Sequence, residues 1–364
     1  MHITSLTLRN FRSYEEAEVL PGEGMTVFSG PNAQGKTNIL EAMHLCCTGR
    51  SHRTSHDEEM IRWGSPAAKV SVLSSQKDGT HEVSVILTKG QKKKKSVRIG
   101  ARQAERIGEL FGHVFGVLFS PEDLQIVKGG PSERRRFLDM QLSQLRPAYF
   151  YALQQSARIL GQRNALLRAV SEHPSLEGTL DTWDEQLALS GASIVKARRE
   201  VIGELSRMAC EEHRNLTAGK EELSLRYTSE AAQQEDPGAF LLRRLQETRA
   251  DDIRRMTTST GVHRDDIVIS IGGRDARTYA SQGQQRSAVL SLKLAQTSFA
   301  EKERGEPPSL MLDDVMSELD PDRRRQLIER IGCMQTFVTC TDISDLAGAT
   351  QGRIYQVREG KLYV

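Results

Sequence analysis

Residues 30–37 of this chain read Gly-Pro-Asn-Ala-Gln-Gly-Lys-Thr, and this octapeptide constrains the fold more than any other stretch. It matches G-x-x-x-x-G-K-[ST], a loop whose glycines let backbone N–H groups turn toward phosphate oxygens. The apolar residues before it predict a buried strand over 25–28, and those of 38–47 predict a helix that stops at Gly49. Strand, glycine loop and helix in this order predict a phosphate-binding helix N-terminus rather than a turn with a chance Lys-Thr pair.

Every residue of this loop is a candidate contact to a nucleotide, because the backbone wraps the phosphates over its whole length. Lys36 is expected to reach the β- and γ-phosphates of ATP, and the Thr37 hydroxyl is expected to ligate Mg²⁺. Arg53 follows the same predicted helix in a polar loop, where it is either exposed to solvent or a second phosphate contact. The expected nucleotide contacts in this part are Gly30, Pro31, Asn32, Ala33, Gln34, Gly35, Lys36, Thr37 and Arg53.

The composition of the chain restricts its class. Its 364 residues exceed one typical domain, and its net charge of +2 places any nucleic-acid surface in local clusters. Five cysteines without a C-x-x-C pair suit a reducing compartment and argue against a disulfide framework and a zinc site. Because no apolar run has the length of a membrane span and residues 1–20 lack a signal-peptide pattern, we expect a cytoplasmic protein without a membrane partner.

The hydrophobic pattern divides the chain into an α/β part and a helical insertion. Alternation over 67–100 predicts a β-meander with a lysine-rich hairpin tip. Helical periodicity dominates the middle of the chain, with a turn near Pro174 between two long helices, and strand patterns then return. We therefore expect an α/β head domain built from residues 1–135 and 257–364, and a helical arm built from residues 136–256.

Three further expectations concern single elements. Ser132 is expected to cap a helix that follows a Gly-Gly-Pro stop. Residues 237–256 predict one helix, and residues 278–280 predict a strand after the Gly-Gly turn at 272–273.

Two basic clusters are candidates for contacts to DNA phosphates. The run 134–136 lies in the first turn of a predicted helix, the unfavourable end for cations, so either an anionic partner or the chain's own carboxylates must account for it. Lysines 92–95 form either a solvated loop or a contact to a phosphate backbone. The candidate DNA contacts are Arg134, Arg135, Arg136, Lys93 and Lys94.

A phosphate-binding loop of this kind needs a second element nearby, an acidic residue that can hold Mg²⁺. Residues 309–312 predict a buried strand, and Asp313 follows at its carboxyl edge, where ligands of parallel sheets bind. We expect Asp313 to hold Mg²⁺ and Asp314 to orient or deprotonate the attacking water. Lys36, Asp313 and Asp314 are thus the candidate catalytic residues, and Thr37 and Asp313 the candidate metal ligands.

A Ser-x-Gly-Gln segment at 281–284, called the signature segment below, opens a second predicted helix. It predicts a second phosphate-binding helix N-terminus. One chain rarely needs two such sites for one triphosphate, so we expect Ser281, Gly283 and Gln284 to contact the γ-phosphate of ATP held by another copy. The sequence therefore predicts an ATP-dependent homodimer.

These three motifs, together with Ser317–Asp320 after the second acid, resemble the ABC-type ATPase heads of the SMC superfamily. Within that superfamily the chain is similar to the RecF family of bacterial recombination mediators. The segments that carry this resemblance are 8–14, 49–54, 119–124, 261–266 and 312–315. It implies an ABC-type, SMC-head-like fold with a mixed sheet and an inserted arm, slow DNA-stimulated ATP hydrolysis, and DNA binding at gaps or junctions. It also implies partnership with RecO and RecR in loading RecA during DNA repair, replication restart and SOS induction.

Some positions depart from the superfamily pattern. Asp314 stands where ABC heads generally carry Glu, and the shorter side chain predicts slow turnover. Ser120 lies near the usual position of a Gln, and Thr341 stands where many heads carry a switch His. Other classes remain open: an ATPase subunit of another assembly such as a transporter, a structural SMC-like head, and a small-molecule kinase that would not need Ser281.

Overall fold

The computed structural model describes residues 1–91, 94–332, 334–346 and 352–364, and the chain forms two compact units. The head unit comprises Met1–Leu124, Glu211–Glu221 and Arg286–Val364, and the arm unit comprises Gln125–Cys210 and Glu222–Gln285. Residues 257–285, which carry the signature segment, group with the arm unit. The expected bounds, 1–135 with 257–364 for the head and 136–256 for the arm, stay a prediction.

The first sheet of the head unit is antiparallel and has the order β2-β1-β4-β5-β6-β7. Its strands are β1 (His2–Phe11), β2 (Tyr14–Val19), β4 (Ala67–Gln76), β5 (Gly79–Thr88), β6 (Lys95–Ile99) and β7 (Arg102–Gln103). The meander predicted over 67–100 is confirmed, because β4 pairs with β5 and β5 with β6. Alternate residues such as Val70, Val72, Val83 and Val85 are buried, which is the period of a strand with one covered face.

The second sheet of the head unit has the order β15-β14-β3-β13-β12-β8. Its strands are β3 (Met25–Ser29), β8 (Gly116–Phe119), β12 (Ser309–Leu312), β13 (Thr336–Cys340), β14 (Arg353–Arg358) and β15 (Lys361–Tyr363). All neighbours pair in parallel except β14 with β15, so the sheet is mixed as expected. The carboxyl ends of β3, β12 and β13 therefore lie at one edge, where ligands of parallel sheets bind.

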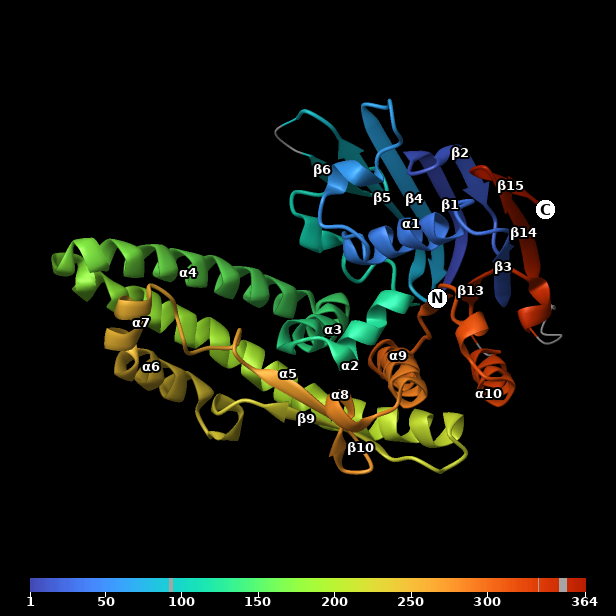
Figure 1. The fold of residues 1–364 in the computed structure, drawn as a ribbon. Coiled ribbons are helices and arrows are strands. Elements are labelled where there is room, and N and C mark those ends of the chain that lie inside the picture. The colour runs from blue at the N-terminus through green and yellow to red at the C-terminus, as the bar shows by residue number, and fades with distance from the viewer. Residues whose placement is uncertain (92–93, 333, 347–351) are drawn as a thin grey trace. The chain divides into compact units, whose positions relative to one another are not determined.

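Helix α1 (Lys36–Thr48) follows β3 and packs against strands of both sheets (Figure 1). Its apolar residues on all sides, from Ile39 to Cys47, are buried, which is the pattern of a helix enclosed by other layers. The head unit also contains α10 (Pro321–Ile331) and most of α9 (Gln282–Arg304). No helix in the described ranges has the length and apolar character to cross a membrane.

The arm unit contains the long helix α4 (Pro147–Glu172) and most of α5 (Leu180–Leu216), which run antiparallel, as predicted, with a turn between them (Figure 1). Shorter elements complete it: α2 (Gln125–Lys128), α3 (Pro131–Leu145), α6 (Pro237–Glu247), α7 (Arg249–Arg255), α8 (Ala276–Tyr279), β9 (Leu223–Thr228), β10 (Asp266–Ile271) and β11 (Arg274–Asp275). The long helices are joined by a buried ion pair in which Arg163 Nε donates to Asp184 Oδ1 at 2.6 Å. Arg163 Nη1 also donates to Asp252 Oδ2 of α7 at 2.8 Å, so one guanidinium ties three helices together.

Three of the single-element predictions are wrong. Helix α3 begins at Pro131 with Gly130 as N-cap and without a side-chain cap, so Ser132 lies inside the helix. Residues 237–256 form two helices, α6 and α7, which meet at Thr248, where the backbone has left the helical region with ψ 1°. Residues 278–280 are not a strand: Asp275 accepts a hydrogen bond from Thr278 N and starts the short helix α8.

Candidate functional site

The predicted phosphate loop lies between the end of β3 and the start of α1, and its backbone depends on two glycines. Gly30 has φ 149° and Gly35 has φ 111°, conformations that residues with side chains rarely adopt. A Cβ on Gly30 would lie 2.5 Å from Val357 O, and one on Gly35 would lie 2.7 Å from Ser13 Oγ. The loop is therefore closely packed from behind, and its open side faces the helix N-terminus, where phosphates bind.

Segments from both ends of the chain hold this loop in place. From the start of β2, the Tyr14 hydroxyl donates to Gly35 O at 3.0 Å. From the β14–β15 turn, Glu359 N donates to Gln34 Oε1 at 2.7 Å and Gly360 N donates to Gln34 O at 3.2 Å. Burial raises the pKa of the Tyr14 phenol, so Tyr14 remains a donor at neutral pH. The contribution of residues 359–360 was missed, because nothing in the local pattern connects this turn to the loop.

Lys36 is the first residue of α1, and its side chain is folded back over the loop. Its Nζ donates to Gly30 O at 2.7 Å and to Pro31 O at 3.0 Å. The ammonium group is thus held by two carbonyls at the position from which it is expected to meet phosphate oxygens.

Thr37 and Asp313 are brought together although 276 positions separate them in the sequence. Thr37 Oγ1 donates to Asp313 Oδ1 at 2.9 Å, and Thr339 Oγ1 of β13 donates to the same oxygen at 2.8 Å. Burial raises the pKa of Asp313 to about 6, against the lowering effect of these hydrogen bonds. Mg²⁺ prefers a few hard oxygen ligands together with water and phosphate, so a hydroxyl and a carboxylate in contact fit it.

Asp314 follows at the same edge and lies on the phosphate pocket. Its φ of 52° is unusual for a residue with a side chain, and its N–H donates to Thr339 Oγ1 at 2.9 Å. Thr339 therefore fixes both acids, since it donates to Asp313 and accepts from Asp314. The pocket has a volume of about 340 Å³ and is lined by Asn32, Ala33, Gly35, Lys36, Thr37, Asn38, Arg53 and Asp314.

Arg53 lies on this pocket rather than away from it. Its Nη1 donates to Asn38 Oδ1 at 3.1 Å, and it lies 3.8 Å from the buried carboxylate of Glu41. Burial acts to raise the pKa of Glu41, but hydrogen bonds from Arg12 and Ser51 and the charge of Arg12 hold it below its usual value. Glu41 is thus a fixed negative charge on α1 that orients arginines from two neighbouring loops.

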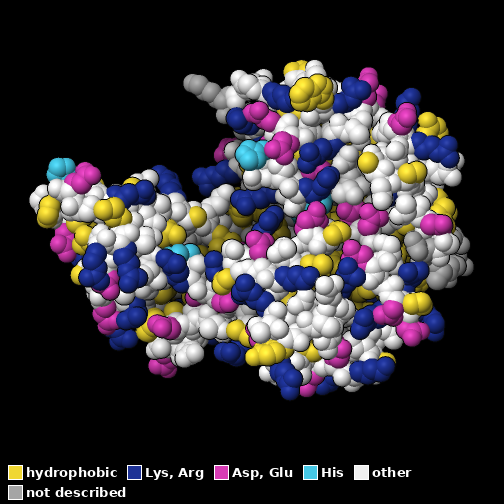
Figure 2. All heavy atoms as spheres, viewed as in Figure 1, with side chains coloured by type: hydrophobic (Ala, Val, Ile, Leu, Met, Phe, Trp, Pro, Cys, Tyr) yellow, Lys and Arg dark blue, Asp and Glu magenta, His cyan; other side chains and the backbone are white. Residues whose placement is uncertain are grey.

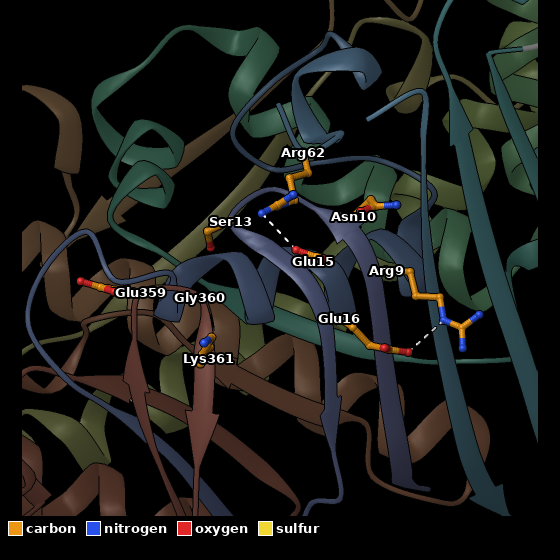
Figure 3. Close-up of a pocket in the computed structure, with 9 residues that line it drawn as sticks. All are labelled: Arg9, Asn10, Ser13, Glu15, Glu16, Arg62, Glu359, Gly360 and Lys361. Atoms are coloured by element: carbon orange, nitrogen blue, oxygen red, sulfur yellow. Dashed lines mark ion pairs between the residues drawn. The ribbon is translucent and has the colours of Figure 1, made fainter. Parts of the chain in front are cut away.

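A second, open pocket of about 680 Å³ adjoins the phosphate loop (Figure 3). It shares Ser13 and Gly360 with the support of that loop. Figure 3 shows Arg62 directed toward Glu15 and Arg9 toward Glu16, with N–O distances of 3.3 Å in both pairs. Its other lining residues are Asn10, Glu359 and Lys361. The lining of this pocket thus contains both positive and negative side chains. The sequence alone did not predict this pocket.

The signature segment begins α9 and belongs to the arm unit. Ser281 is exposed, its Oγ accepts from Gln284 N at 3.2 Å, and Gln284 Oε1 accepts from Ser281 N at 2.8 Å. This reciprocal pair is a capping box, which satisfies two donors at the helix end. Gly283 is partly buried in the same turn. The predicted helix start is confirmed, while the role of Ser281, Gly283 and Gln284 toward a nucleotide stays a prediction.

The candidate DNA contacts have different surroundings. Arg134 is buried, and its guanidinium donates two hydrogen bonds of 2.8 Å to the carboxylate of Asp266, so one of the chain's own carboxylates accounts for this arginine. Arg135 Nη1 donates to Asp265 O at 2.6 Å, whereas Arg136 is exposed. Lys94 pairs with Glu58 at 2.8 Å on the surface, and Lys93 lies outside the described residues.

Charge on the face in Figure 2 agrees with these individual environments. Acidic side chains are interspersed with the Lys and Arg side chains there, so positive charge is compensated over much of that face. Among the described candidates, Arg136 is exposed to solvent, and its role toward DNA stays a prediction.

Comparisons with known proteins agree with this geometry. A family profile described as AAA domain matches residues 5–236. DNA replication and repair protein RecF of Ruminiclostridium cellulolyticum is 44% identical over 347 residues, covering 94% of this chain and 93% of that protein. A solved structure described as the recombination mediator protein RecF-ATP in the RecFOR pathway has a TM-score of 0.92 and 33% identity, covering 100% of this chain and 97% of that one.

A more distant structure shows how widely the fold is shared. An Smc head domain with an extended coiled coil, bound to the C-terminal domain of ScpA derived from Pyrococcus furiosus, superposes with a TM-score of 0.58 at 18% identity. It covers 99% of this chain and 95% of that one, and it supports the expected SMC-head-like fold. With the identity and coverage of the first two relatives, these findings show that the chain belongs to the RecF family.

Proposed function

We propose that this protein is an ATP-binding, DNA-binding recombination mediator that hydrolyses ATP as a switch. The observation that carries the proposal is the hydrogen bond to Asp313 from Thr37, which lines the same pocket as Lys36. Membership of the RecF family adds the relatives' role in DNA replication and repair and their place in the RecFOR pathway. We propose that this chain works with RecO and RecR. In that role it promotes RecA loading in DNA repair, replication restart and SOS induction.

The residues around the phosphate pocket have different proposed roles in binding and hydrolysing ATP. The backbone of residues 30–35 and Lys36 bind the phosphates, and Arg53 adds a cation on the pocket wall. Thr37 and Asp313 are the residues that would hold Mg²⁺, which supplies charge neutralisation at the β- and γ-phosphates when bound. Asp314 lies on the same pocket and orients water for attack. Because the carboxylate of Asp314 is one methylene shorter than that of Glu, turnover is slow.

The proposal of a dimer is based on the N-terminus of α9. Ser281 is exposed at the start of α9, so it is accessible to a nucleotide bound by another copy. We propose that two copies close over two ATP molecules, and that loss of the γ-phosphate on hydrolysis releases them.

DNA binding in this proposal uses phosphate contacts at gaps or junctions. Arg136 is exposed on α3, and Arg134 is excluded as a direct contact because Asp266 occupies its guanidinium. Phosphate contacts predict an affinity that falls steeply with salt and depends little on sequence. An affinity that does not change between low and moderate salt would contradict this part.

The proposal as a whole is tested by measuring particle mass and DNA binding together, with and without ATP. We expect a monomer without ATP, and a dimer with higher DNA affinity when ATP is present. The Lys36→Ala variant is the control, because it lacks the cation that meets the phosphates and so remains a monomer in ATP. If mass and DNA affinity were the same in both conditions, the switch role would be rejected.

A further inference from the structure

Glu41 is a fully buried carboxylate on α1, one helical turn after Thr37. Arg12 Nε donates to Glu41 Oε2 at 2.8 Å, and Arg12 Nη2 donates to Glu41 Oε1 at 2.6 Å. The Ser51 hydroxyl also donates to Oε1, and Arg53 Nη1 lies 3.8 Å from Oε2. One buried negative charge therefore faces two guanidinium groups, and it binds them unequally.

Arg12 is fixed in its contact with Glu41. Its backbone N–H donates to Met60 O at 2.8 Å, and its Nη1 donates to Glu59 O at 2.8 Å. Its side chain is 18% exposed, and a bidentate pair between a guanidinium and a carboxylate has strong, charge-assisted hydrogen bonds. Arg12 therefore compensates the charge of Glu41 through contacts that hold the guanidinium in place.

Arg53 is held much more loosely. Its side chain is 41% exposed, and its distance of 3.8 Å from Glu41 is too long for a hydrogen bond. Its Nη1 donates to Asn38 Oδ1 at 3.1 Å, while its backbone N–H donates to Ser51 Oγ at 3.0 Å. Among the described residues, Arg53 and Asn38 line the phosphate pocket, whereas Arg12 does not. The backbone of Arg53 is thus fixed beside the pocket, and its guanidinium is free to move.

The charge of Glu41 determines what such a movement costs. A buried carboxylate that loses its cationic partner is strongly destabilising. Because Arg12 pairs with Glu41, Arg53 can leave its present position without leaving Glu41 uncompensated. In the absence of Arg12, Arg53 would be the guanidinium that pairs with Glu41, and moving it to a phosphate would break a buried ion pair.

We propose that Arg12 is a positioning residue for the nucleotide: by pairing with Glu41 it leaves the guanidinium of Arg53 free to bind a phosphate group of ATP. This inference rests on the proposed ATP site and explains how one of its cations is kept available. Arg12 acts through Glu41 and Arg53, and it does not need to touch the nucleotide.

The first test is the affinity for a slowly hydrolysed ATP analogue, measured by calorimetry. In Arg12→Gln the unpaired Glu41 holds Arg53, so we expect the affinity to fall by on the order of tenfold to a hundredfold, as in Arg53→Ala. Adding Glu41→Gln to Arg12→Gln should restore most of this affinity, because no carboxylate then competes for Arg53. Arg12→Lys, which keeps the compensating charge, should also retain most of it.

A double-mutant cycle shows whether Arg12 acts through Arg53. If it does, Arg12→Gln weakens analogue binding in the parent protein but has no further effect in an Arg53→Ala background. Equal losses in both backgrounds would show that Arg12 contacts the nucleotide directly, and this outcome would overturn the proposal.

Loss of stability is controlled by a second ion pair of the same construction. Arg330 Nε and Nη2 donate to the buried carboxylate of Glu212, which also accepts from the Ser298 hydroxyl. Arg330→Gln therefore leaves a buried carboxylate unpaired, as Arg12→Gln does, but outside the phosphate pocket. We expect both variants to melt at lower temperature, and only Arg12→Gln to bind the analogue more weakly. Equal weakening by both would attribute the effect to stability and reject the inference.

The remaining outcomes separate this inference from the proposed function. A parent protein that does not bind the analogue would reject both. Binding by the parent protein, with an unchanged affinity in Arg12→Gln, would overturn the inference and leave the proposed function standing. The same conclusion would follow if the Arg12→Gln, Glu41→Gln double variant bound the analogue no better than Arg12→Gln.

Discussion

The N-termini of α1 and α9 are both expected to bind phosphate, yet they are built differently. At α1 the N-cap is Gly35 in a left-handed conformation, without a side-chain cap, and two distant segments support the loop. At α9 the N-cap region is closed by Ser281 and Gln284 from its own first turn. The N-terminus of α1 therefore depends on long-range packing, whereas the N-terminus of α9 is stabilised by residues of its own first turn.

This difference suggests an order of events. A loop without a side-chain cap presents its backbone donors to a ligand, so we expect the α1 site to bind nucleotide already in the monomer. A capped and exposed helix N-terminus is stable alone, and we expect it to contact phosphate only when another copy supplies one. In the proposed dimer, the α1 site is thus the half that forms first, and the N-terminus of α9 is the half that completes it.

The largest expected effect comes from Gly35→Ala, which breaks the first half. The variant forces a left-handed residue to carry a Cβ 2.7 Å from Ser13 Oγ, so the loop must shift. We expect ATP affinity to fall by at least about tenfold, measured by calorimetry. Gly24→Ala is the control, since no atom lies within 4 Å of its Cβ position. Similar affinities for the two variants would refute the packing argument.

The next effect separates the two halves. Ser281→Arg places a large cation at the exposed tip of α9, so ATP binding should persist while ATP-dependent dimerisation and ATPase activity are lost. Ser281→Ala is the matched variant, because it removes only the cap, at a cost of about 1 kcal/mol of stability. Light scattering with ATP distinguishes them, and a dimer formed by Ser281→Arg would disprove the composite site.

A smaller effect is expected on ATP hydrolysis in the proposed dimer. Asp314→Asn keeps the size of the side chain but removes the base, so hydrolysis should slow by on the order of a hundredfold and the ATP-bound dimer should persist. Phosphate release and particle mass are the measurements. Asp322→Asn, which alters a side chain with 84% exposure on α10, should hydrolyse ATP at the parent rate. Fast turnover by Asp314→Asn would assign the base to another residue.

The smallest effect tests how α9 is anchored. His213 is fully buried at the end of α5, with Ser291 Oγ of α9 at 3.0 Å and Glu221 at 3.1 Å. Burial lowers the pKa of His213, although Glu221 acts to raise it. The unfolded chain, with a His pKa of about 6.5, therefore binds the proton more readily. Stability should accordingly fall as the pH drops below about 6.5 toward the lowered pKa.

Denaturant unfolding at about pH 7.5 and about pH 5.5 measures this dependence. His213→Gln should reduce the loss of stability on acidification, whereas His56→Gln, at an exposed histidine, should leave it unchanged. An unaltered dependence in His213→Gln would show that other groups determine the acid sensitivity.

Several features of the site were predictable because they are local. The glycine loop, the strand before it and the helix after it follow from residues within about two dozen positions, and the structure confirms all three elements. Asp313 was expected at the carboxyl edge of β12 because a buried strand that ends in an acid has few other placements in a parallel sheet. The start of α9 was equally readable from Ser281 and Gln284.

The failures came from elements in which local signals competed. Residues 278–280 alternate as a strand does, but the Asp275 cap selected a helical turn. The periodicity of 237–256 is continuous, yet the segment divides at Thr248, whose backbone has a ψ of 1° outside the helical region.

The sequence by itself determined the local elements on which the proposed chemistry rests: a glycine loop that opens a helix, an acid that follows a buried strand, and a second capped helix N-terminus. Only the tertiary structure decided which charged side chains are left free to contact a ligand or DNA, because ion pairing depends on residues far apart in the chain. Arg134 meets Asp266, Lys94 meets Glu58, and Thr37 meets Asp313 across 276 positions. Local patterns specify secondary structure through short-range geometry, whereas the partner of a side chain is set by how the sheets and helices pack.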